Sequence, residues 1–280
     1  MAVAARLGLT SLAPVVLKDS HHTSIHLAPA RIVARVIATD VSADAYRRLD
    51  RELGVAAHLA RAGAPIVPPC TEVPPGPYFH EKLGLTLWQF VAHHPARDRD
   101  ALAATGALHR AHAALASYAG ALPPFAGEAD ACRAALEDES ALPALAPADR
   151  AFLLAAHDRL RRRLAEPAVA PVALHGDPHL GNVLMTAHGP LWTDWESACR
   201  GPLEWDLSSL PDAALAAFPV VDRGLLATLR DLRSVCVAVW CWNQPERAAE
   251  KREAAQFHLR RLRQAAVANS TNRQQTVTQR

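Results

Sequence analysis

Alternating apolar and polar positions, rich in β-branched residues, dominate the first third of the chain. Short polar or proline-containing turns separate three such stretches, which predict strands at residues 14–18, 23–27 and 32–37. Proline-rich connections then lead to two more apolar stretches, residues 78–79 and 83–91. These two stretches predict a hairpin with Gly84 near its turn, so the N-terminal pattern as a whole predicts a small sheet.

A helical pattern interrupts these strands. Apolar residues recur with a period near 3.6 at Ala45, Leu49, Leu53, Ala56 and Leu59. Ser42 is a suitable N-cap, and Gly63 is a suitable stop signal. The sequence therefore predicts one helix that runs from about residue 42 to residue 62 and packs its apolar stripe on the sheet.

Helical spacing replaces the alternation from residue 97 onward. Alanine- and leucine-rich segments predict helices at residues 101–118, 129–136 and 147–164. A β-rich segment interrupts them at residues 171–195, and further helices are expected over residues 203–266. The later part of the chain is therefore expected to be mainly helical, with an embedded hairpin.

This order predicts an α+β protein with two lobes and a cleft between them. The small, β-rich N-terminal lobe comprises residues 1–91, and the larger, mainly helical C-terminal lobe comprises residues 92–268. Residues 269–280 are polar and aperiodic, which predicts a flexible tail.

Composition and charge narrow the choice of partners. A net charge of +2 at pH 7 is too small to indicate a surface for nucleic acid. The five cysteines are scattered and lack C-x-x-C spacing, so neither a disulfide framework nor a zinc ribbon is predicted. No apolar run approaches the length that spans a bilayer, so no membrane partner is expected. We expect a cytoplasmic protein that is a monomer or a homodimer.

The most informative segment is the apolar strand and turn that begin at residue 172. It carries His175 and Asp177, and Asn182 follows five residues after the aspartate. This H-x-D-x-x-x-x-N spacing is that of the catalytic loop of kinases. In such a loop the carboxylate meets the hydroxyl that is phosphorylated, and the amide oxygen reaches a Mg²⁺ ion held by the phosphates. The segment therefore predicts phosphoryl-transfer chemistry.

A predicted hairpin, with its turn at residues 188–190, brings a second carboxylate to the same place. Its returning strand ends at Asp194, and Glu196 follows two residues later. Because Mg²⁺ prefers oxygen ligands and keeps several waters, one Asp and one Asn suffice beside phosphate oxygens. Asp194 thus matches the metal-binding Asp of the kinase D-F-G position.

Three motifs occur together in this part of the chain: His175-Gly-Asp-Pro-His-Leu-Gly-Asn-Val-Leu184, Trp192-Thr-Asp-Trp-Glu196 and Gly201-Pro-Leu-Glu-Trp-Asp-Leu207. In order and separation they closely resemble the aminoglycoside phosphotransferase and choline kinase-like family, the phosphotransferase enzyme family with a protein-kinase-like fold. The resemblance implies an ATP- and Mg²⁺-dependent kinase that phosphorylates a hydroxyl of a small molecule such as an antibiotic, an amino sugar or another metabolite.

Roles follow from the resemblance for residues of these motifs. Asp177 would accept the proton of the acceptor hydroxyl, and Asn182 and Asp194 would hold the metal. Glu196 would assist a second ion or position the substrate. His175 and Asp206 would support the catalytic loop structurally.

The nucleotide side matches the family less completely. Ile32-Val-Ala-Arg-Val36 resembles the strand that usually carries a lysine, with Arg35 in its place and Glu52 as the expected acidic partner. Residues Trp88, Gln89 and Phe90 lie where the family's hinge meets adenine through main-chain groups. The expected phosphate-covering segment, residues 19–24, contains no glycine. ATP is the expected nucleotide, with GTP as the alternative.

Two other hypotheses remain open from the sequence. His175, Asp177 and His179 alternate, so on an extended strand they would share a face and could bind Zn²⁺ as in a metallohydrolase. Alternatively, the glycine-free segment and Arg35 would suit a pseudokinase that binds a nucleotide or metabolite without turnover.

Overall fold

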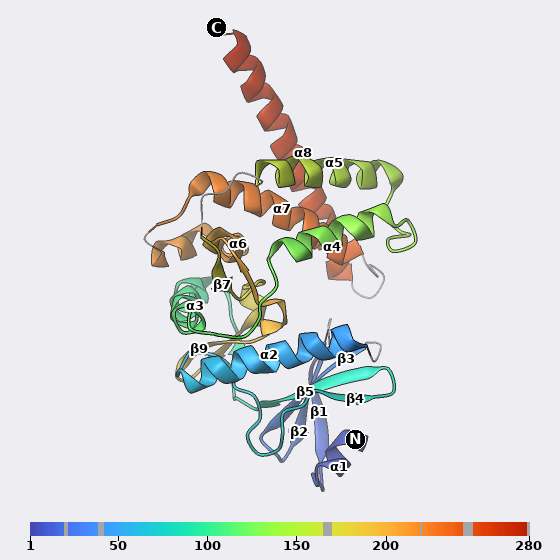
Figure 1. The fold of residues 1–280 in the computed structure, drawn as a ribbon, viewed down its shortest axis with the longest axis vertical. Helices are drawn as coiled ribbons and strands as arrows, with labels where there is room; N and C mark the ends of the chain where they lie inside the picture. The colour runs from blue at the N-terminus through green and yellow to red at the C-terminus, as the bar shows by residue number, and fades with distance from the viewer. Residues whose placement is uncertain (20–21, 39–41, 165–169, 219, 243–248, 279–280) are drawn as a thin grey trace. The chain divides into compact units, whose positions relative to one another are not determined.

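A computed structural model gives the structure of residues 1–19, 22–38, 42–164, 170–218, 220–242 and 249–278 (Figure 1). The chain forms two compact units. The first unit comprises Met1–Leu122, Val172–Arg200 and Leu210–Pro219, and the second comprises Pro123–Pro171, Gly201–Ser209 and Val220–Arg280. These units do not test the predicted division into an N-terminal lobe of residues 1–91 and a C-terminal lobe of residues 92–268, which stays a prediction.

A five-stranded antiparallel sheet begins the first unit, with strand order β1-β2-β3-β5-β4. Its strands are β1 (Ala13–Asp19), β2 (Thr23–Ala28), β3 (Ile32–Ala38), β4 (Tyr78–His80) and β5 (Leu83–Gln89). The three predicted strands and the predicted hairpin are therefore confirmed. The turn of the hairpin, however, lies at Glu81 and Lys82, and Gly84 sits inside β5 opposite Phe79. Glu81 itself adopts the left-handed conformation with φ 53° that the turn requires.

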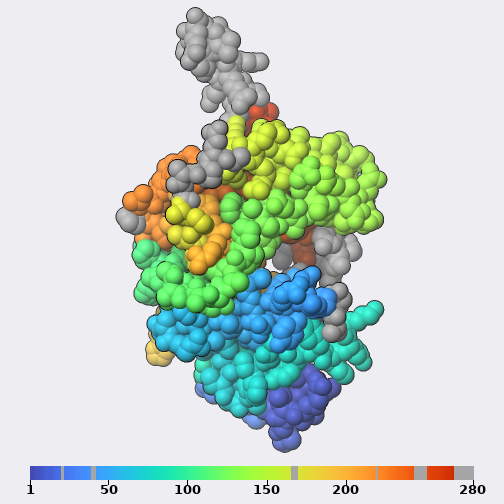
Figure 2. All heavy atoms as spheres, in the orientation of Figure 1, coloured from blue at the N-terminus to red at the C-terminus, as the bar shows by residue number. Residues whose placement is uncertain are grey.

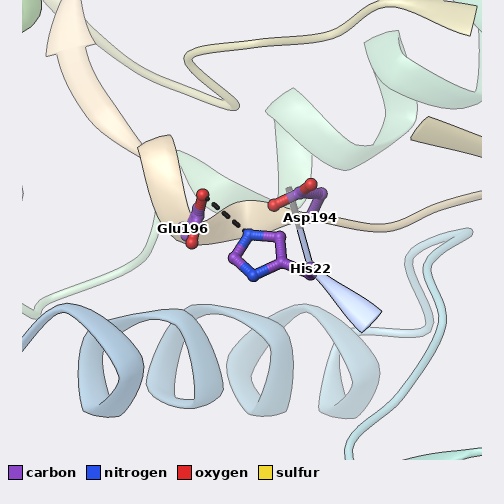
Figure 3. A group of neighbouring side chains, drawn as sticks. All are labelled: His22, Asp194 and Glu196. Carbon is purple, nitrogen blue, oxygen red and sulfur yellow. Dashed lines mark hydrogen bonds and ion pairs between the residues drawn. The ribbon is translucent and has the colours of Figure 1, made fainter. Parts of the chain in front are cut away.

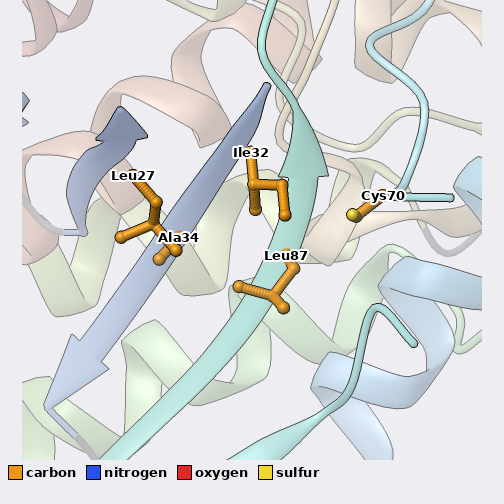
Figure 4. Close-up of a cluster of buried hydrophobic side chains, with 5 residues drawn as sticks. All are labelled: Leu27, Ile32, Ala34, Cys70 and Leu87. Atoms are coloured by element: carbon orange, nitrogen blue, oxygen red, sulfur yellow. The ribbon is translucent and has the colours of Figure 1, made fainter. Parts of the chain in front are cut away.

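The two faces of β3 serve different purposes, because side chains alternate along a strand. Ile32 and Ala34 point into an apolar cluster with Leu27, Cys70 and Leu87 (Figure 4). Val33 and Arg35, on the opposite face, line a pocket instead. One face of β3 therefore belongs to the apolar core, and the other face directs the side chain of Arg35 toward the pocket.

Helix α2 (Ala43–Arg61) begins and ends where the sequence predicts. The hydroxyl of Ser42 accepts a hydrogen bond from the backbone N–H of Ala45 at 3.1 Å, which caps the helix, and Gly63 follows the helix with φ 70°. The buried face of α2 carries Leu49, Leu53 and Leu59, whereas its outer face is open at the surface (Figure 2). One polar residue, Glu52, is buried among these apolar residues.

Helix α3 (Ala101–Leu115) and several short elements complete the first unit. These elements are α1 (Ala2–Arg6), β6 (His94–Pro95), η1 (Asp98–Asp100), β7 (Val172–Leu174), η2 (Leu180–Asn182), β8 (Val183–Thr186), β9 (Gly189–Trp192), η3 (Trp195–Ser197), β10 (Cys199–Gly201) and η4 (Asp212–Ala217). Strands β8 and β9 form the predicted hairpin, whose turn is at Ala187 and His188. The indole N–H of Trp192 donates to the carbonyl of Ala104 at 2.8 Å and so fixes β9 to α3.

The second unit is helical. It contains α4 (Ala126–Glu137), α5 (Pro147–Arg163), α6 (Leu203–Leu207), α7 (Arg223–Trp242) and α8 (Ala249–Thr278). Helix α7 packs against α4, α5, α6 and α8. Helix α8 continues into the segment expected to be a polar tail, which is helical up to Thr278. Among the residues whose structure is described, no helix is long and apolar enough to cross a membrane.

An antiparallel sheet followed by a mainly helical part confirms the predicted α+β class.

Candidate active site

The turn after β7 is shaped by a glycine that has no substitute. Gly176 adopts φ 92°, and a Cβ atom built there would lie 1.9 Å from the carbonyl oxygen of Ser197. No side chain fits in that space, and L-residues rarely adopt such a φ. Gly176 therefore lets the backbone that precedes Asp177 pass directly against the backbone that follows Glu196.

His175 holds the turn from the inside. Its Nδ1 accepts a hydrogen bond from the backbone N–H of Asp177 at 3.3 Å, which leaves Nε2 to donate to the carbonyl of Thr193 at 3.0 Å. The ring is fully buried and packs against Trp192 and Trp195, with centroid separations of 5.4 Å and 4.4 Å. These contacts fit the structural role expected for His175, which itself stays a prediction. They also argue against the zinc hypothesis, because both ring nitrogens already contact the backbone.

Asn182 closes the loop on its other side. Its side-chain Nδ2 donates to the carbonyl of Asp177 at 3.0 Å, and its backbone N–H donates to His179 at 2.9 Å. Because the amide nitrogen is used in this way, the amide oxygen is the group of Asn182 that can serve as a metal ligand.

The carboxylate of Asp177 remains accessible. Its side chain is 33% exposed, and its Oδ2 lies 3.6 Å from Nε2 of His179. The backbone of Asp177, in contrast, is held by His175 on one side and Asn182 on the other. The loop therefore fixes the backbone of Asp177, while its carboxylate stays partly exposed to solvent.

Asp194 occupies an unusual backbone conformation. It is left-handed, with φ 70° and ψ 56°, at the point where β9 turns into η3. Non-glycine residues in this region cost free energy and cluster at functional sites. The backbone N–H of Thr193 donates to the carbonyl of Asn182 at 3.0 Å. The two predicted metal ligands, Asn182 and Asp194, are thereby brought together.

Arg35 joins the sheet to these carboxylates. Its guanidinium donates to Glu52 and to Asp194, the latter at 2.5 Å, and its Nη2 lies 3.5 Å from Oε2 of Glu196. The expected contact between Arg35 and Glu52 is thus present, and Glu52 is completely buried. One arginine therefore faces three carboxylates.

Burial and charge act in opposite directions on this group. Burial by itself would lower the pKa of Arg35, but the carboxylates of Glu52, Asp194 and Glu196 outweigh it and raise that pKa. Burial raises the pKa of Glu52 to about 8, despite the opposing effect of Arg35. Burial would also raise the pKa of Glu196, but hydrogen bonding to His22 and the charge of Arg35 bring it well below its usual range. Glu196 is therefore ionised, whereas Glu52 is easily protonated.

A pocket of about 410 Å³ opens beside this group within the first unit. Arg35, Asn182 and Asp194 line it, as do the predicted hinge residues Trp88, Gln89 and Phe90. The structure thus brings six predicted site residues to one pocket. Much of the remaining lining is apolar and includes Leu17, Val33, Val67, Leu180, Val183 and Leu184.

Five predicted residues do not line the pocket, and one of them, His175, is the buried ring described above. Glu52 and Glu196 are reached through Arg35, and Asp177 lies at the loop beside Asn182. Asp206 is buried on α6, in the second unit, so its support of the loop stays a prediction.

His22 is a residue of this site that the sequence analysis did not single out. It lines the pocket and its Nε2 lies 3.1 Å from Oε1 of Glu196, 174 positions away in sequence. The only sequence signal was a His-His pair within the glycine-free segment 19–24. Residues 20 and 21 of that segment lie outside the described residues.

The donor atoms at the site fit a hard divalent cation. The amide oxygen of Asn182 and the carboxylates of Asp194 and Glu196 are the oxygen donors that Mg²⁺ prefers. In the described part of the chain, Oε2 of Glu196 is buried and accepts no hydrogen bond, and its one ion pair is the 3.5 Å contact with Arg35. A buried carboxylate oxygen that accepts no hydrogen bond is costly, and a bound cation would compensate it.

Comparison with known proteins identifies the family of the chain. Residues 24–265 match the model of the phosphotransferase enzyme family, and the chain belongs to that family. A search of curated protein sequences gives no match.

Solved structures share the fold at low sequence identity. The choline kinase LicA from Streptococcus pneumoniae is 14% identical, with a TM-score of 0.67 over 92% of this chain and 97% of that one. An aminoglycoside-3'-phosphotransferase of type VIII is 19% identical, with a TM-score of 0.62 over 84% and 97%. Amicoumacin kinase, solved with AMP-PNP, Ca²⁺ and its antibiotic, is 12% identical, with a TM-score of 0.65 over 89% and 87%. The protein therefore has the kinase-like fold that the sequence motifs predict.

Proposed function

We propose that this protein is an ATP- and Mg²⁺-dependent kinase that phosphorylates a hydroxyl group of a small molecule. The observation that carries the proposal is the pocket that gathers Arg35, Asn182 and Asp194 in one place. These are a phosphate-binding cation and two oxygen ligands, which phosphoryl transfer requires together. The related structures support the proposal, because they include kinases that act on choline and on antibiotics.

Arg35 would bind the phosphates of the nucleotide in place of the usual lysine. A guanidinium is planar and binds phosphate oxygens through two parallel hydrogen bonds, so it can replace the ammonium group with altered geometry. The ion pair with Glu52 holds Arg35 at the floor of the pocket, since Glu52 is anchored on the buried face of α2.

Asn182, Asp194 and Glu196 would hold the metal. When bound, Mg²⁺ supplies charge neutralisation for the transferred phosphoryl group. The chain itself contributes rigidity. Hydrogen bonds from His175 and Asn182 to the backbone fix the ligands Asn182 and Asp194 before the nucleotide binds.

Asp177 would serve as the general base. It would take the proton of the acceptor hydroxyl while that oxygen bonds to the γ-phosphorus and the bond from phosphorus to the ADP oxygen breaks. The products are then a phosphate ester, ADP and one proton. Its accessible carboxylate on a fixed backbone suits this role.

The adenine would lie beside Trp88, Gln89 and Phe90, at the apolar part of the pocket. The AMP-PNP bound to amicoumacin kinase supports nucleotide binding in a protein of this fold. Main-chain groups would recognise the base, so ATP is proposed and GTP is a direct comparison in the test.

An ADP-release assay with Mg²⁺, ATP or GTP, and a panel of aminoglycosides, amino alcohols and other hydroxylated metabolites tests the function. Asp177→Asn should keep nucleotide affinity within about threefold and lower turnover by about a hundredfold or more, as expected for a general base. Asp98→Asn, which changes an exposed carboxylate on η1, is the matched control and should leave both unchanged.

Two results would contradict the proposal. Activity of Asp177→Asn above a few per cent of the wild type would remove Asp177 from its role. Nucleotide binding without ADP release for any acceptor would favour the pseudokinase hypothesis, which the glycine-free segment motivates.

A further inference from the structure

Three side chains from distant parts of the chain converge beside the pocket (Figure 3). His22 lies immediately before β2, Asp194 follows β9, and Glu196 belongs to η3. One ligand atom from each lies within 4.8 Å of the others. Figure 3 shows the imidazole of His22 beside both carboxylates, with Nε2 directed at Glu196.

The spacing of these atoms suits one metal ion. Ligand atoms held at about 2.1 Å from an octahedral ion lie roughly 3 Å apart when adjacent and roughly 4.2 Å apart when opposite. The 3.1 Å between Nε2 of His22 and Oε1 of Glu196 matches an adjacent pair. The outer limit of 4.8 Å is within a small side-chain rotation of an opposite pair.

The two carboxylates and the buried imidazole favour a cation at this point, although it would share the carboxylates with an arginine. His22 is 7% exposed, and Oε2 of Glu196 is buried and accepts no hydrogen bond in the described part of the chain. Arg35 bonds to Asp194 and its Nη2 lies 3.5 Å from Oε2 of Glu196, and Arg51 donates to the backbone carbonyl of Glu196 at 3.1 Å. Arg35 binds Oδ1 of Asp194, so Oδ2 is the oxygen of that residue that a metal would use.

We propose that His22 is a further protein ligand, beside Asn182, Asp194 and Glu196, and that its imidazole makes the site bind a divalent first-row transition metal more tightly than Mg²⁺. The chemical reason is the imidazole nitrogen: Mg²⁺ strongly prefers oxygen, whereas transition metals accept imidazole readily. The inference deepens the proposed function, on which it rests for the nucleotide phosphates that would complete the coordination. The glycine-free segment at residues 19–24 would then contribute a metal ligand through His22.

Mn²⁺ binding to the nucleotide-free protein tests the inference without reference to activity. The paramagnetic resonance signal of free aqueous Mn²⁺ falls as the ion binds, and Mg²⁺ competition gives the relative affinity. The wild type should bind one Mn²⁺ that about a tenfold excess of Mg²⁺ displaces by less than half. His22→Ala should weaken Mn²⁺ binding by about tenfold or more and Mg²⁺ binding by less than about threefold.

Two further variants separate ligation from a structural effect of His22. His188→Ala, which removes an exposed histidine in the β8–β9 turn, is the matched control and should bind Mn²⁺ like the wild type. His22→Asp replaces nitrogen by oxygen at the same place. It should bind both ions, with a Mn²⁺ preference reduced to about twofold or less.

Equal Mn²⁺ affinity in the wild type and in His22→Ala, or no saturable Mn²⁺ binding to the wild type, would overturn the inference. The ADP-release assay keeps this failure separate from failure of the proposed function. A protein that transfers phosphate but binds Mn²⁺ independently of His22 keeps its function and loses this inference. A protein that binds Mn²⁺ through His22 without transferring phosphate would keep the metal ligand and lose the proposed kinase function.

Discussion

The two sides of the pocket are held in place by different forces. On the side of the β8–β9 hairpin, backbone hydrogen bonds and buried rings fix Asp177, Asn182 and Asp194. On the side of the sheet, ion pairs among side chains fix Arg35 and Glu52. The first arrangement depends on close packing, whereas the second depends on charge.

This difference determines how each side should respond to change. Packed backbone tolerates almost no added volume, but it is indifferent to pH and salt. A buried ion pair tolerates the loss of both partners better than the loss of one, and it responds to protonation. Substitutions on the two sides should therefore fail in distinguishable ways.

The largest effect is expected on the hairpin side, from Gly176→Ala. The new methyl group would meet the carbonyl oxygen of Ser197, so the two backbone segments must separate. We expect a loss of at least about 4 kcal/mol in the free energy of unfolding, measured by urea denaturation.

Gly189→Ala provides the matched control. Gly189 also has a positive φ, 108°, but nothing lies within 4 Å of its added Cβ. It should lose only about 1–2 kcal/mol, from backbone strain alone. Similar losses for the two variants would show that crowding at Gly176 is unimportant and that the hairpin side is not fixed by packing.

An intermediate effect is expected on the sheet side, from Arg35→Met. This substitution keeps most of the side-chain volume but leaves the carboxylate of Glu52 buried without its partner. The expected loss is about 3 kcal/mol, measured by urea unfolding at about pH 9, above the pKa of Glu52, where its carboxylate is ionised. The double variant Arg35→Met, Glu52→Gln should recover about half of that loss or more. No recovery would mean that the two residues are not energetically coupled.

The same contrast explains what the sequence could predict. Each local signal acts on residues close to it in sequence: Ser42 caps α2 at Ala45, Gly63 follows the end of that helix, and Asn182 bonds to Asp177. A local sequence pattern can therefore predict their effects. Arg35 and Glu52 were predicted from the resemblance of Ile32-Val-Ala-Arg-Val36 to the family's lysine-bearing strand, together with the helical stripe that places Glu52 beside Leu49 and Leu53. His22 reaches Glu196 through a contact across most of the chain, and no local pattern encodes such a contact.

The β4–β5 hairpin shows the limit of a local signal. Gly84 was expected near the turn and is two residues from it, but the turn itself is at Glu81 and Lys82, and Glu81 is a non-glycine residue in the left-handed region. Gly84 pairs with Phe79 inside β5, so the glycine indicated the hairpin without identifying the turn residues. The flexible tail at residues 269–280 stays a prediction.

The smallest effect, and the sharpest test of charge against packing, is the dependence of stability on pH. Burial raises the pKa of Glu52 from its ordinary value of 4.5 to about 8, so between these values the folded protein holds a proton that the unfolded chain has lost. Stability from this group is therefore present below pH 4.5 and is lost as pH rises through 8. His258 acts in the opposite direction at lower pH, because burial lowers its pKa from 6.5 to about 4 and its contribution is lost as pH falls through that range.

Between pH 7 and 8 the Glu52 effect should dominate, with a loss on the order of 1 kcal/mol in the nucleotide-free protein. Glu52→Gln, which does not titrate, should remove most of this slope, and His258→Asn should leave it intact. An unchanged slope in Glu52→Gln would mean that Glu52 stays ionised beside Arg35, and that the ion pair of the sheet side persists across this pH range.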